Sequence, residues 1–511
     1  MDLSRKIGQL FVVAARGGAL NDDVRRYVRD LHAGGVIWFQ STTAETARVN
    51  AELQSLAKTP LLVSADLESG MGMRFTDATW WPPAMAVAAA GDPELAFQQG
   101  RATASEARAI GVQHILAPVA DVNVDPANPV INTRSFGEDP HEVARYVAAF
   151  VRGIQSEGAL ATAKHFPGHG NTHVDSHRAL PVLDVDRERL DRVELVPFRA
   201  AIDAGVASIM IGHLAVPALD PTLAPVRAEF ENIYGTARDE VTRGGTLPAT
   251  LSRPVIEDLL RRDLGFRGLV VTDSFDMGGL AAHFDPGEAA VRAIEAGNDQ
   301  VLYSADTDAA IAAVHAAVRS GRLPLGRIDA SVERILAAKR ALSSLPSRNV
   351  LRNDDVAYEL ARRSITLVRD ERGLLPLRAR KLTAVVVSDR PEPNPLHDAL
   401  HALAADRVLT LDATSEDVDV DAELLVLLLA LRPISGAGRI AVPAAARRLA
   451  ERHARSCIAI SFGSPYVARE LEGVSTFLCA WGIQPLLQRA AIDALRGAIP
   501  FRGRLPVTIP S

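Results

Sequence analysis

The sequence predicts an α/β protein, with a (β/α)8 barrel followed by a smaller α/β sandwich domain. Short apolar runs rich in Val, Ile and Leu alternate with longer amphipathic stretches, which indicates parallel strands connected by helices. Eight such runs precede Arg340, the number of strands in a closed (β/α)8 barrel. The chain has 511 residues, more than one hydrophobic core usually serves, so a second domain is expected.

The apolar runs expected as barrel strands recur through the first two thirds of the chain. They cover residues 9–15, 35–39, 61–66, 114–119, 160–164, 207–212, 269–273 and 299–303. The stretches expected as helices cover residues 21–33, 44–57, 93–111, 140–158, 186–205, 253–264 and 286–297. Pro93 and Pro140, each preceded by an aspartate, open two of these helices. Four of the helices end at glycines, namely Gly111, Gly158, Gly205 and Gly297.

The expected barrel ends before the segment SSLPSRNVLRN. We therefore assign residues 1–342 to a catalytic barrel, 343–353 to a linker and 354–511 to the α/β sandwich domain. In the sandwich domain, an expected helix near 354–364 precedes apolar runs at 365–368, 382–387, 408–411, 424–430, 458–462 and 476–481. Because no cluster of His, Asp or Lys and no glycine-rich phosphate motif follows these runs, we expect a structural or regulatory role for this domain.

Composition argues against several classes of partner. A formal net charge of −6 gives no reason to expect binding to nucleic acid or to an anionic membrane surface. Both cysteines, Cys457 and Cys479, lie in apolar runs, so buried free thiols are expected rather than a disulfide. Neither a secretory signal nor a membrane-spanning segment is evident, and we expect a cytoplasmic location.

Polar side chains recur at the carboxyl ends of the expected barrel strands. They are Asp66, Asp121, Lys164 with His165, His213 and Asp273. Strand ends carry some polar residues simply because loops begin there, but that explanation covers one or two positions better than five. Barrel enzymes assemble their active sites at this face. The sequence therefore predicts an active site at the carboxyl ends of the strands.

The stretch ATAKHFPGHGNTHVDSH, residues 161–177, holds four histidines, a lysine and an aspartate. Its proline and glycines prevent a regular helix. In an extended loop, residues i and i+2 point the same way, so Asp175 and His177 should meet. An aspartate that accepts the imidazole N–H fixes the tautomer and stabilises the charged ring, which makes His177 a candidate general acid/base. The alternative is a salt bridge on the surface of the loop.

Asp273 follows a buried strand in FRGLVVTDSFDM. A carboxylate fixed at a rigid strand end is suited to act as a nucleophile or as a charge stabiliser. The alternative is the N-cap of the next helix, although Ser274 and Asp276 could serve there instead. We therefore expect Asp273 to be catalytic.

The remaining polar residues suggest sugar binding more than metal binding. His169, His173 and His177 recur every four residues, but the glycines around them argue against the helix that would make this a metal site, so we expect no metal and no cofactor. Lys164, His165 and Arg134 could donate hydrogen bonds to hydroxyl groups, and Asp66 could accept them. Aromatic residues that could stack on a sugar, or simply pack, are Trp80, Trp81 and Phe136.

Four segments of the chain resemble family 3 glycoside hydrolases, and in particular the bacterial β-N-acetylglucosaminidases of that family. They are KHFPGHG with the downstream DSH, the loop NPVINTRSFGEDP, LPATLSRPVIEDLLR and GLVVTDSFDM. The resemblance covers most of residues 1–340 and continues through LARRSITLVRDERGLLPL. It implies a retaining double displacement with Asp273 as nucleophile, His177 as acid/base and Asp175 as its partner. It also implies that the terminal N-acetylglucosamine is bound by Asp66, Arg134, Lys164 and His165.

The chain departs from the family pattern at two places. Family members often read D-Q-E-G-G-R where this sequence reads DLESGM, so Met71 replaces the arginine and Arg74 follows. Asn171 stands where aspartate is common. The resemblance implies release of N-acetylglucosamine from muropeptide or chito-oligosaccharide fragments. The alternatives are a β-glucosidase or β-xylosidase that uses a sandwich-domain carboxylate such as Glu470, a phosphorylase, a metal-dependent barrel hydrolase, and a sugar-binding relative without activity.

Overall fold

The computed structural model describes residues 1–15, 20–227, 245–343, 352–378, 381–388 and 394–510. The chain forms two compact units. The barrel unit comprises Met1–Ala78, Ala96–Val122 and Pro140–Arg352, and the sandwich unit comprises Thr79–Leu95, Asn123–Asp139 and Asn353–Ser511. Most of the linker expected at 343–353, namely residues 344–351, lies outside the described residues.

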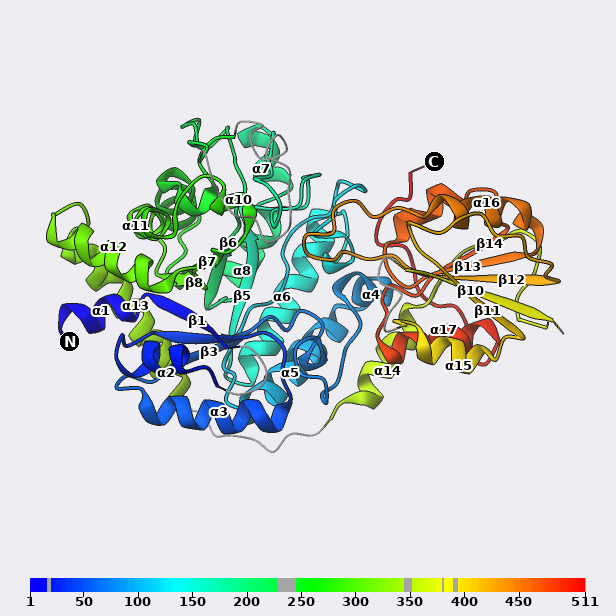
Figure 1. The fold of residues 1–511 in the computed structure, drawn as a ribbon, viewed down its shortest axis with the longest axis horizontal. Coiled ribbons are helices and arrows are strands. Elements are labelled where there is room, and N and C mark those ends of the chain that lie inside the picture. Colours follow the sequence, from blue (N-terminus) through cyan, green and yellow to red (C-terminus); the bar gives the residue numbers. More distant parts are fainter. Residues whose placement is uncertain (16–19, 228–244, 344–351, 379–380, 389–393, 511) are drawn as a thin grey trace. The chain divides into compact units, whose positions relative to one another are not determined.

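Eight parallel strands of the barrel unit close into a barrel in chain order, as the sequence predicts (Figure 1). They are β1 (Phe11–Ala15), β2 (Gly35–Trp38), β3 (Leu62–Ala65), β4 (His114–Ile115), β5 (Leu160–Phe166), β6 (Ser208–Ile211), β7 (Leu269–Ser274) and β8 (Gln300–Leu302). The register closes through pairs such as Val12 with Leu302. Each strand falls within, or within three residues of, an apolar run of the sequence.

The described helices of the barrel unit include the seven expected segments. They are α1 (Leu3–Gly8), α2 (Asp22–Arg29), α3 (Thr43–Leu56), η1 (Met71–Met73), α5 (Pro93–Ala109), α6 (Pro140–Ser156), α7 (Arg187–Arg192), α8 (Val196–Asp203), η3 (Ala249–Leu251), η4 (Pro254–Asp263), α10 (Gly278–Ala281), α11 (Pro286–Ala296), α12 (Thr307–Arg319) and α13 (Leu325–Ser343). The glycine stops are confirmed by positive φ angles of 82° at Gly111, 73° at Gly158, 78° at Gly205 and 123° at Gly297. The helix expected over 186–205 is instead two helices, because Pro197 lies in the first turn of α8 and favours a new helix start there.

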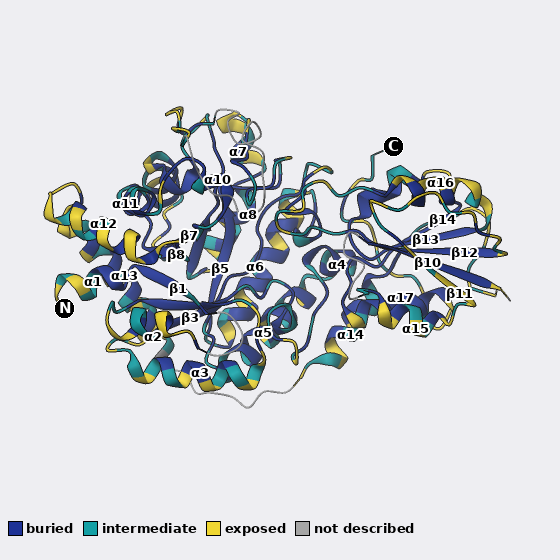
Figure 2. Ribbon diagram, in the orientation of Figure 1, coloured by how far each residue is buried: buried dark blue, intermediate teal, exposed yellow. Residues whose placement is uncertain are grey.

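The barrel encloses a small aliphatic core, and a larger one lies under its helices. The inner core consists of buried residues from six of the strands or their ends, namely Val12, Ile37, Leu116, Met210, Val271 and Leu302. Figure 2 shows the barrel strands almost wholly buried, with exposed residues on the outer sides of the helices. Burying one such aliphatic side chain stabilises the fold by about 1.5–3 kcal/mol. The strand ends are therefore rigid positions for functional side chains.

The sandwich unit has the α/β architecture that the sequence predicts. Its described strands form one six-stranded sheet in the order β11-β10-β12-β13-β14-β9, in which β9 is the antiparallel edge. They are β9 (Thr366–Asp370), β10 (Leu382–Ser388), β11 (Arg407–Leu411), β12 (Leu424–Ala430), β13 (Cys457–Ser461) and β14 (Thr476–Cys479). Its helices are α4 (Ala84–Ala89), η2 (Asn132–Arg134), α14 (Asp354–Ser364), α15 (His397–Leu403), α16 (Ala444–Arg452), η5 (Ala454–Ser456), η6 (Pro465–Leu471) and α17 (Pro485–Leu495). Cys457 and Cys479 are buried free thiols, as expected.

Two segments that the sequence assigns to the barrel domain belong to the sandwich unit by their contacts. Met85 and Ala86 of α4 lie in the same buried cluster as Leu427 of β12. The Asn123 side-chain amide donates a 3.0 Å hydrogen bond to the Tyr466 hydroxyl. The chain thus leaves the barrel after β3 and again after β4.

No described helix is long and apolar enough to cross a membrane.

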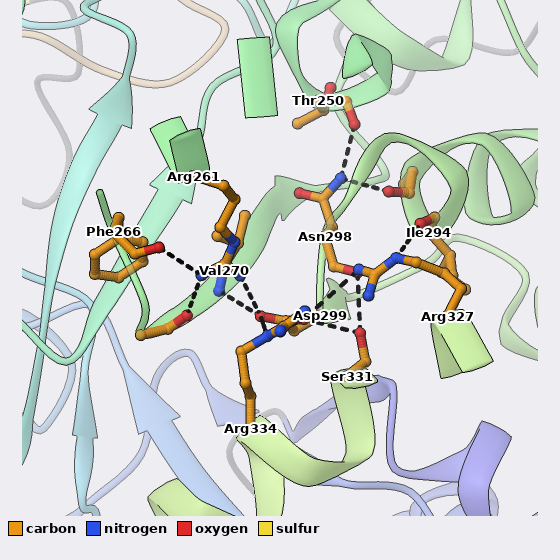
Figure 3. A network of polar contacts seen from close by, with 12 residues as sticks. Thr250, Arg261, Phe266, Val270, Ile294, Asn298, Asp299, Arg327, Ser331 and Arg334 are labelled. Carbon is orange, nitrogen blue, oxygen red and sulfur yellow. Dashed lines mark hydrogen bonds and ion pairs between the residues drawn. The ribbon is translucent and has the colours of Figure 1, made fainter. Parts of the chain in front are cut away.

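At the amino ends of β7 and β8, a buried carboxylate holds several elements together (Figure 3). Asp299 is fully buried, and its Oδ2 accepts hydrogen bonds from Val270 N at 3.0 Å and Arg261 Nη2 at 2.7 Å. Its Oδ1 accepts from Ser331 Oγ at 2.8 Å and Arg334 Nε at 3.0 Å. This cluster, which we call the Asp299 network, joins η4, β7 and α13 at the face opposite the predicted active site.

Candidate active site

Lys164, near the end of β5, is the centre of a buried ion cluster. Its side chain is 3% exposed, and Nζ lies 2.8 Å from Asp66 Oδ1 and 2.7 Å from Glu68 Oε1. Arg74 Nη2 donates to the other Asp66 oxygen at 2.6 Å. Burial alone would raise the pKa of Asp66, but Lys164 and Arg74 lower it to about 2. The cluster therefore presents a permanently ionised, well-oriented carboxylate, which suits the recognition of hydroxyl groups.

His165 and the start of the following loop are fixed by Asp121. This fully buried aspartate follows β4 and accepts hydrogen bonds from His165 Nδ1 at 2.8 Å and from His169 N at 2.7 Å. It also accepts the His165 backbone N–H at 3.2 Å. The sequence places Asp121 at a strand end but does not identify its partner. The two residues are 44 positions apart, so only the fold shows that Asp121 contacts His165.

His169 stabilises the loop through Thr172. The Thr172 hydroxyl donates to His169 O at 3.0 Å and lies 2.7 Å from His169 Nδ1, so Nδ1 is the donor of that second contact. Burial lowers the pKa of His169 to about 4, which keeps the ring neutral. His173 is exposed, so the three histidines at four-residue spacing have different surroundings. Among the described residues no group of three His, Cys, Asp or Glu side chains is arranged to hold a metal ion.

Asp175 and His177 meet as expected, but in a turn and not in the extended loop that the sequence suggested, since the Arg178 backbone N–H donates to Asp175 O at 2.9 Å. Asp175 Oδ1 accepts both the His177 backbone N–H and His177 Nδ1, each at 2.9 Å. The Asp175 side chain is 2% exposed, whereas that of His177 is 18% exposed. Because a carboxylate only accepts at neutral pH, Nδ1 carries the hydrogen, and Nε2 is the nitrogen suited to exchange a proton with a substrate.

Asp273 is the penultimate residue of β7 and lies among several histidines. Its Oδ1 accepts the Ser274 backbone N–H at 2.8 Å. Burial alone would raise the pKa of Asp273, but His165, His213, the Ser274 N–H and His177 together lower it below its usual value. The carboxylate is therefore ionised at neutral pH, as a nucleophile must be. The same electrostatic contacts connect Asp273 with the acid/base candidate His177 and the binding candidate His165.

Asp276 is a further carboxyl group near Asp273 and His177. It accepts the Ser274 hydroxyl at 2.8 Å, and burial raises its pKa, which Asp273 raises further. The sequence suggests it only as a helix cap. Its proximity to the two catalytic candidates follows from the turn after β7, which sequence spacing does not define.

Arg134 lies in the sandwich unit, in η2, whereas the six other candidate residues lie in the barrel unit. Its Nη1 donates to Val130 O at 3.0 Å. The aromatic candidates also belong to the sandwich unit. Trp81 and Phe136 are buried, and Trp80 packs against the buried cluster that contains Leu428, so packing accounts for all three.

Comparisons with known proteins agree with these observations. Residues 2–338 match the family model described as the glycosyl hydrolase family 3 N terminal domain. A protein of Cellulomonas fimi named beta-N-acetylglucosaminidase/beta-glucosidase is 33% identical over 544 residues of alignment, covering 99% of this chain and 94% of that protein. Beta-hexosaminidase A of Pseudoalteromonas piscicida is 31% identical, covering 75% of this chain and 67% of that protein. The solved structure of a glycoside hydrolase family 3 beta-N-acetylglucosaminidase from Paenibacillus sp. str. FPU-7 matches with a TM-score of 0.86 at 35% identity, covering 100% of this chain and 99% of that one.

Proposed function

The chain belongs to glycosyl hydrolase family 3, and from this premise we propose that it is an exo-acting β-N-acetylglucosaminidase. It would remove terminal β-linked N-acetylglucosamine from the non-reducing end of a saccharide. The observation that carries the proposal is the contact of 2.9 Å between Asp175 Oδ1 and His177 Nδ1, on a loop electrostatically coupled to Asp273. The names of the relatives from C. fimi and Paenibacillus also support it.

In the first step, an Asp273 oxygen attacks the anomeric carbon while the glycosidic C–O bond breaks. Protonated His177 gives its Nε2 proton to the departing oxygen. The lowered pKa of Asp273 keeps the attacking oxygen ionised, and Asp175 stabilises the charged ring before it gives up the proton. The products of this step are a glycosyl ester on Asp273 and the released alcohol.

In the second step, neutral His177 takes a proton from a water molecule whose oxygen attacks the anomeric carbon. The ester bond to Asp273 breaks, the carboxylate is restored and His177 is again protonated. Two inversions give N-acetylglucosamine with the β configuration retained. Asp175 accepts the Nδ1 hydrogen throughout, so the ring does not change tautomer between the two steps.

The Lys164 cluster is suited to bind the sugar that is released. Asp66, held between Lys164 and Arg74, would accept hydrogen bonds from sugar hydroxyls, and Lys164 and His165 would donate them. We assign Arg134 to the same task from the family resemblance alone. We further propose that the natural substrates are cell-wall muropeptide fragments or chito-oligosaccharides met in the cytoplasm. Relative kcat/KM values on the two fragment classes, measured by mass spectrometry of the products, would rank them.

The experiment that tests the activity is hydrolysis of p-nitrophenyl β-N-acetylglucosaminide. We expect turnover by the wild type, with the β anomer of the product appearing first by NMR. His177→Ala should lose activity steeply on substrates with poor leaving groups and much less on dinitrophenyl glycosides, which need no proton. His173→Ala, in the same loop but exposed, is the matched control and should keep wild-type activity. A wild type that is inactive on this substrate would refute the proposal.

The same variants separate the rival functions. A β-glucosidase with a sandwich-unit acid would tolerate His177→Ala. The carboxylate considered for that role, Glu470, accepts Val442 N at 3.3 Å and lies 3.7 Å from Arg447 in its own unit. A metal hydrolase would lose activity in His173→Ala and in EDTA. A phosphorylase would accelerate in phosphate and yield the sugar 1-phosphate. Assays with p-nitrophenyl β-glucoside and with phosphate therefore accompany the main measurement.

A further inference from the structure

His213, just beyond the end of β6, is a buried histidine to which the proposed reaction gives no role. It is fully buried, with Nε2 2.9 Å from Ser274 O and Nδ1 2.8 Å from the Thr250 hydroxyl. These contacts connect three separate segments: the end of β6, η3 and the end of β7. The segment that His213 reaches on β7 is the one that carries Asp273.

The two contacts define the tautomer of His213. A carbonyl oxygen only accepts, so Nε2 must carry the hydrogen that points at Ser274 O. Burial lowers the pKa of His213, which favours the neutral ring. In the neutral ring Nδ1 is an acceptor, so the Thr250 hydroxyl is the donor. The Ser274 carbonyl therefore fixes the tautomer, and the Thr250 hydroxyl satisfies the Nδ1 lone pair of that tautomer.

The Ser274 peptide that His213 anchors also orients the Asp273 carboxylate. The Ser274 N–H donates to Asp273 Oδ1 at 2.8 Å, and the Ser274 hydroxyl donates to Asp276 Oδ1 at 2.8 Å. The register between β7 and β8 shifts between Val271 and Ser274, so the regular strand ladder is interrupted where Asp273 stands. The hydrogen bond from His213, which follows the other neighbouring strand β6, compensates for that interruption.

We propose that His213 is a positioning residue for the nucleophile. Its Nε2–H donates to the Ser274 carbonyl, the Ser274 N–H in turn donates to one oxygen of Asp273, and the Thr250 hydroxyl holds the imidazole ring by donating to Nδ1. The other Asp273 oxygen then faces the anomeric carbon in a constant direction. The assignment of Asp273 as nucleophile rests on the proposed function, whereas the chain of contacts does not.

The test measures the rate of nucleophilic attack with a substrate whose reaction does not depend on proton donation. A 5-fluoro-N-acetylglucosaminyl fluoride needs little acid assistance and accumulates as an ester on Asp273, which intact-protein mass spectrometry counts. His213→Ala should slow this labelling and kcat about 10- to 100-fold, because small displacements of a reacting group cost that much. The inhibition constant of N-acetylglucosamine should change less than threefold, since the sugar-binding cluster is untouched.

Thr250→Val removes the hydrogen bond to His213 Nδ1 without removing the ring. It should slow labelling in the same direction as His213→Ala but less, and His213→Gln should recover part of the rate because its amide can still donate to Ser274 O. In His213→Ala the acidic limb of the kcat/KM profile should move to higher pH. His165, His213, the Ser274 N–H and His177 lower the pKa of Asp273, and Asp276 faces it with like charge, so removing His213 and loosening the Ser274 contact both raise that pKa.

Thr162→Val is the matched control. Thr162 is a buried threonine bonded at 2.9 Å to another buried histidine, His114, and its loss should affect stability but not labelling. Thr250→Val and His213→Ala labelling within twofold of wild type would overturn the inference, as would an equal loss in Thr162→Val. If the wild type acts on another β-glycoside instead, the proposed function fails, and the His213 series is measured with the matching fluoride.

Discussion

Two carboxylates of the barrel unit, Asp299 at the amino ends of the strands and Asp273 at the carboxyl ends, differ in how completely they are bonded. At the amino ends, Asp299 is fully buried and accepts hydrogen bonds from Val270, Arg261, Ser331 and Arg334. At the carboxyl ends, Asp273 is partly exposed, and within the described residues one hydrogen bond reaches it, from Ser274 N. The first carboxylate has its lone pairs occupied by donors of the fold, whereas the second retains free lone pairs, as the proposed nucleophile requires.

This difference shows that charged neighbours at a strand end do not by themselves single out a candidate catalytic residue. Both aspartates lie beside cationic or ionisable groups at a strand end. A saturated buried carboxylate contributes to stability, because removing it leaves its partners unpaired. An unsaturated one costs stability or contributes little, and its retention has to be explained by chemistry.

The largest expected effect is that of Asp273→Asn. The amide does not attack the anomeric carbon, so kcat should fall about 10⁴-fold or more. The free energy of unfolding should change by about 1 kcal/mol or less, since one hydrogen bond is affected. Initial rates and urea unfolding of the same preparations measure both quantities. Retained activity would mean that the carboxylate is structural after all.

Asp299→Asn should give the opposite pattern. The arginines at 261 and 334 lose their buried partner, and the free energy of unfolding should fall by about 3–5 kcal/mol. The kcat per folded molecule, counted by active-site labelling, should stay within about twofold. A loss of kcat comparable with that of Asp273→Asn, without destabilisation, would contradict a structural role for Asp299.

The same substitution of a buried lysine at each end sharpens the comparison. Lys164→Met removes donors to Asp66 and Glu68, so kcat/KM should fall by a factor that corresponds to about 1.5–3 kcal/mol. Lys339→Met removes a donor 2.6 Å from Gln9 Oε1, and burial lowers the pKa of that lysine to about 7. Lys339→Met should leave kcat/KM unchanged. Equal effects of the two variants on steady-state kinetics would show that the ends do not differ in function.

The smallest expected effect is the loss of folding stability at acidic pH that protonation of Asp66 causes. Its pKa is about 2 in the folded state against an ordinary value of 3.8, so the stabilisation is complete above pH 3.8 and is lost as the pH falls towards 2. It amounts to about 2 kcal/mol. Unfolding free energies between pH 5 and pH 2.5 should decline less steeply in Asp66→Asn than in the wild type. Parallel declines would assign the acid sensitivity to other carboxylates.

Local patterns predicted much of this architecture correctly. Helix stops at Gly111 and Gly158 follow from the left-handed backbone that glycine accepts. The contact between Asp175 and His177 joins residues two positions apart, although a turn and not the expected extended loop brings them together. These features depend on residues a few positions apart, so propensity and spacing are sufficient to infer them.

Contacts across long stretches of sequence could not be inferred in this way. Asp121 and His165 meet across 44 positions, and His213 and Ser274 across 61. The segments 79–95 and 123–139 join the sandwich unit because their apolar residues, such as Met85, complete its core. Which of several suitable partners a side chain meets depends on how the elements pack.

By itself, the sequence determined the strand and helix pattern, the closed barrel and the set of polar residues at the strand ends, because alternating apolar runs and turn residues act locally. Tertiary structure alone decided which carboxylate is saturated with hydrogen bonds and which keeps free lone pairs. That choice between Asp299 and Asp273 depends on which donors the folded chain brings within hydrogen-bonding distance, and no spacing along the chain encodes it.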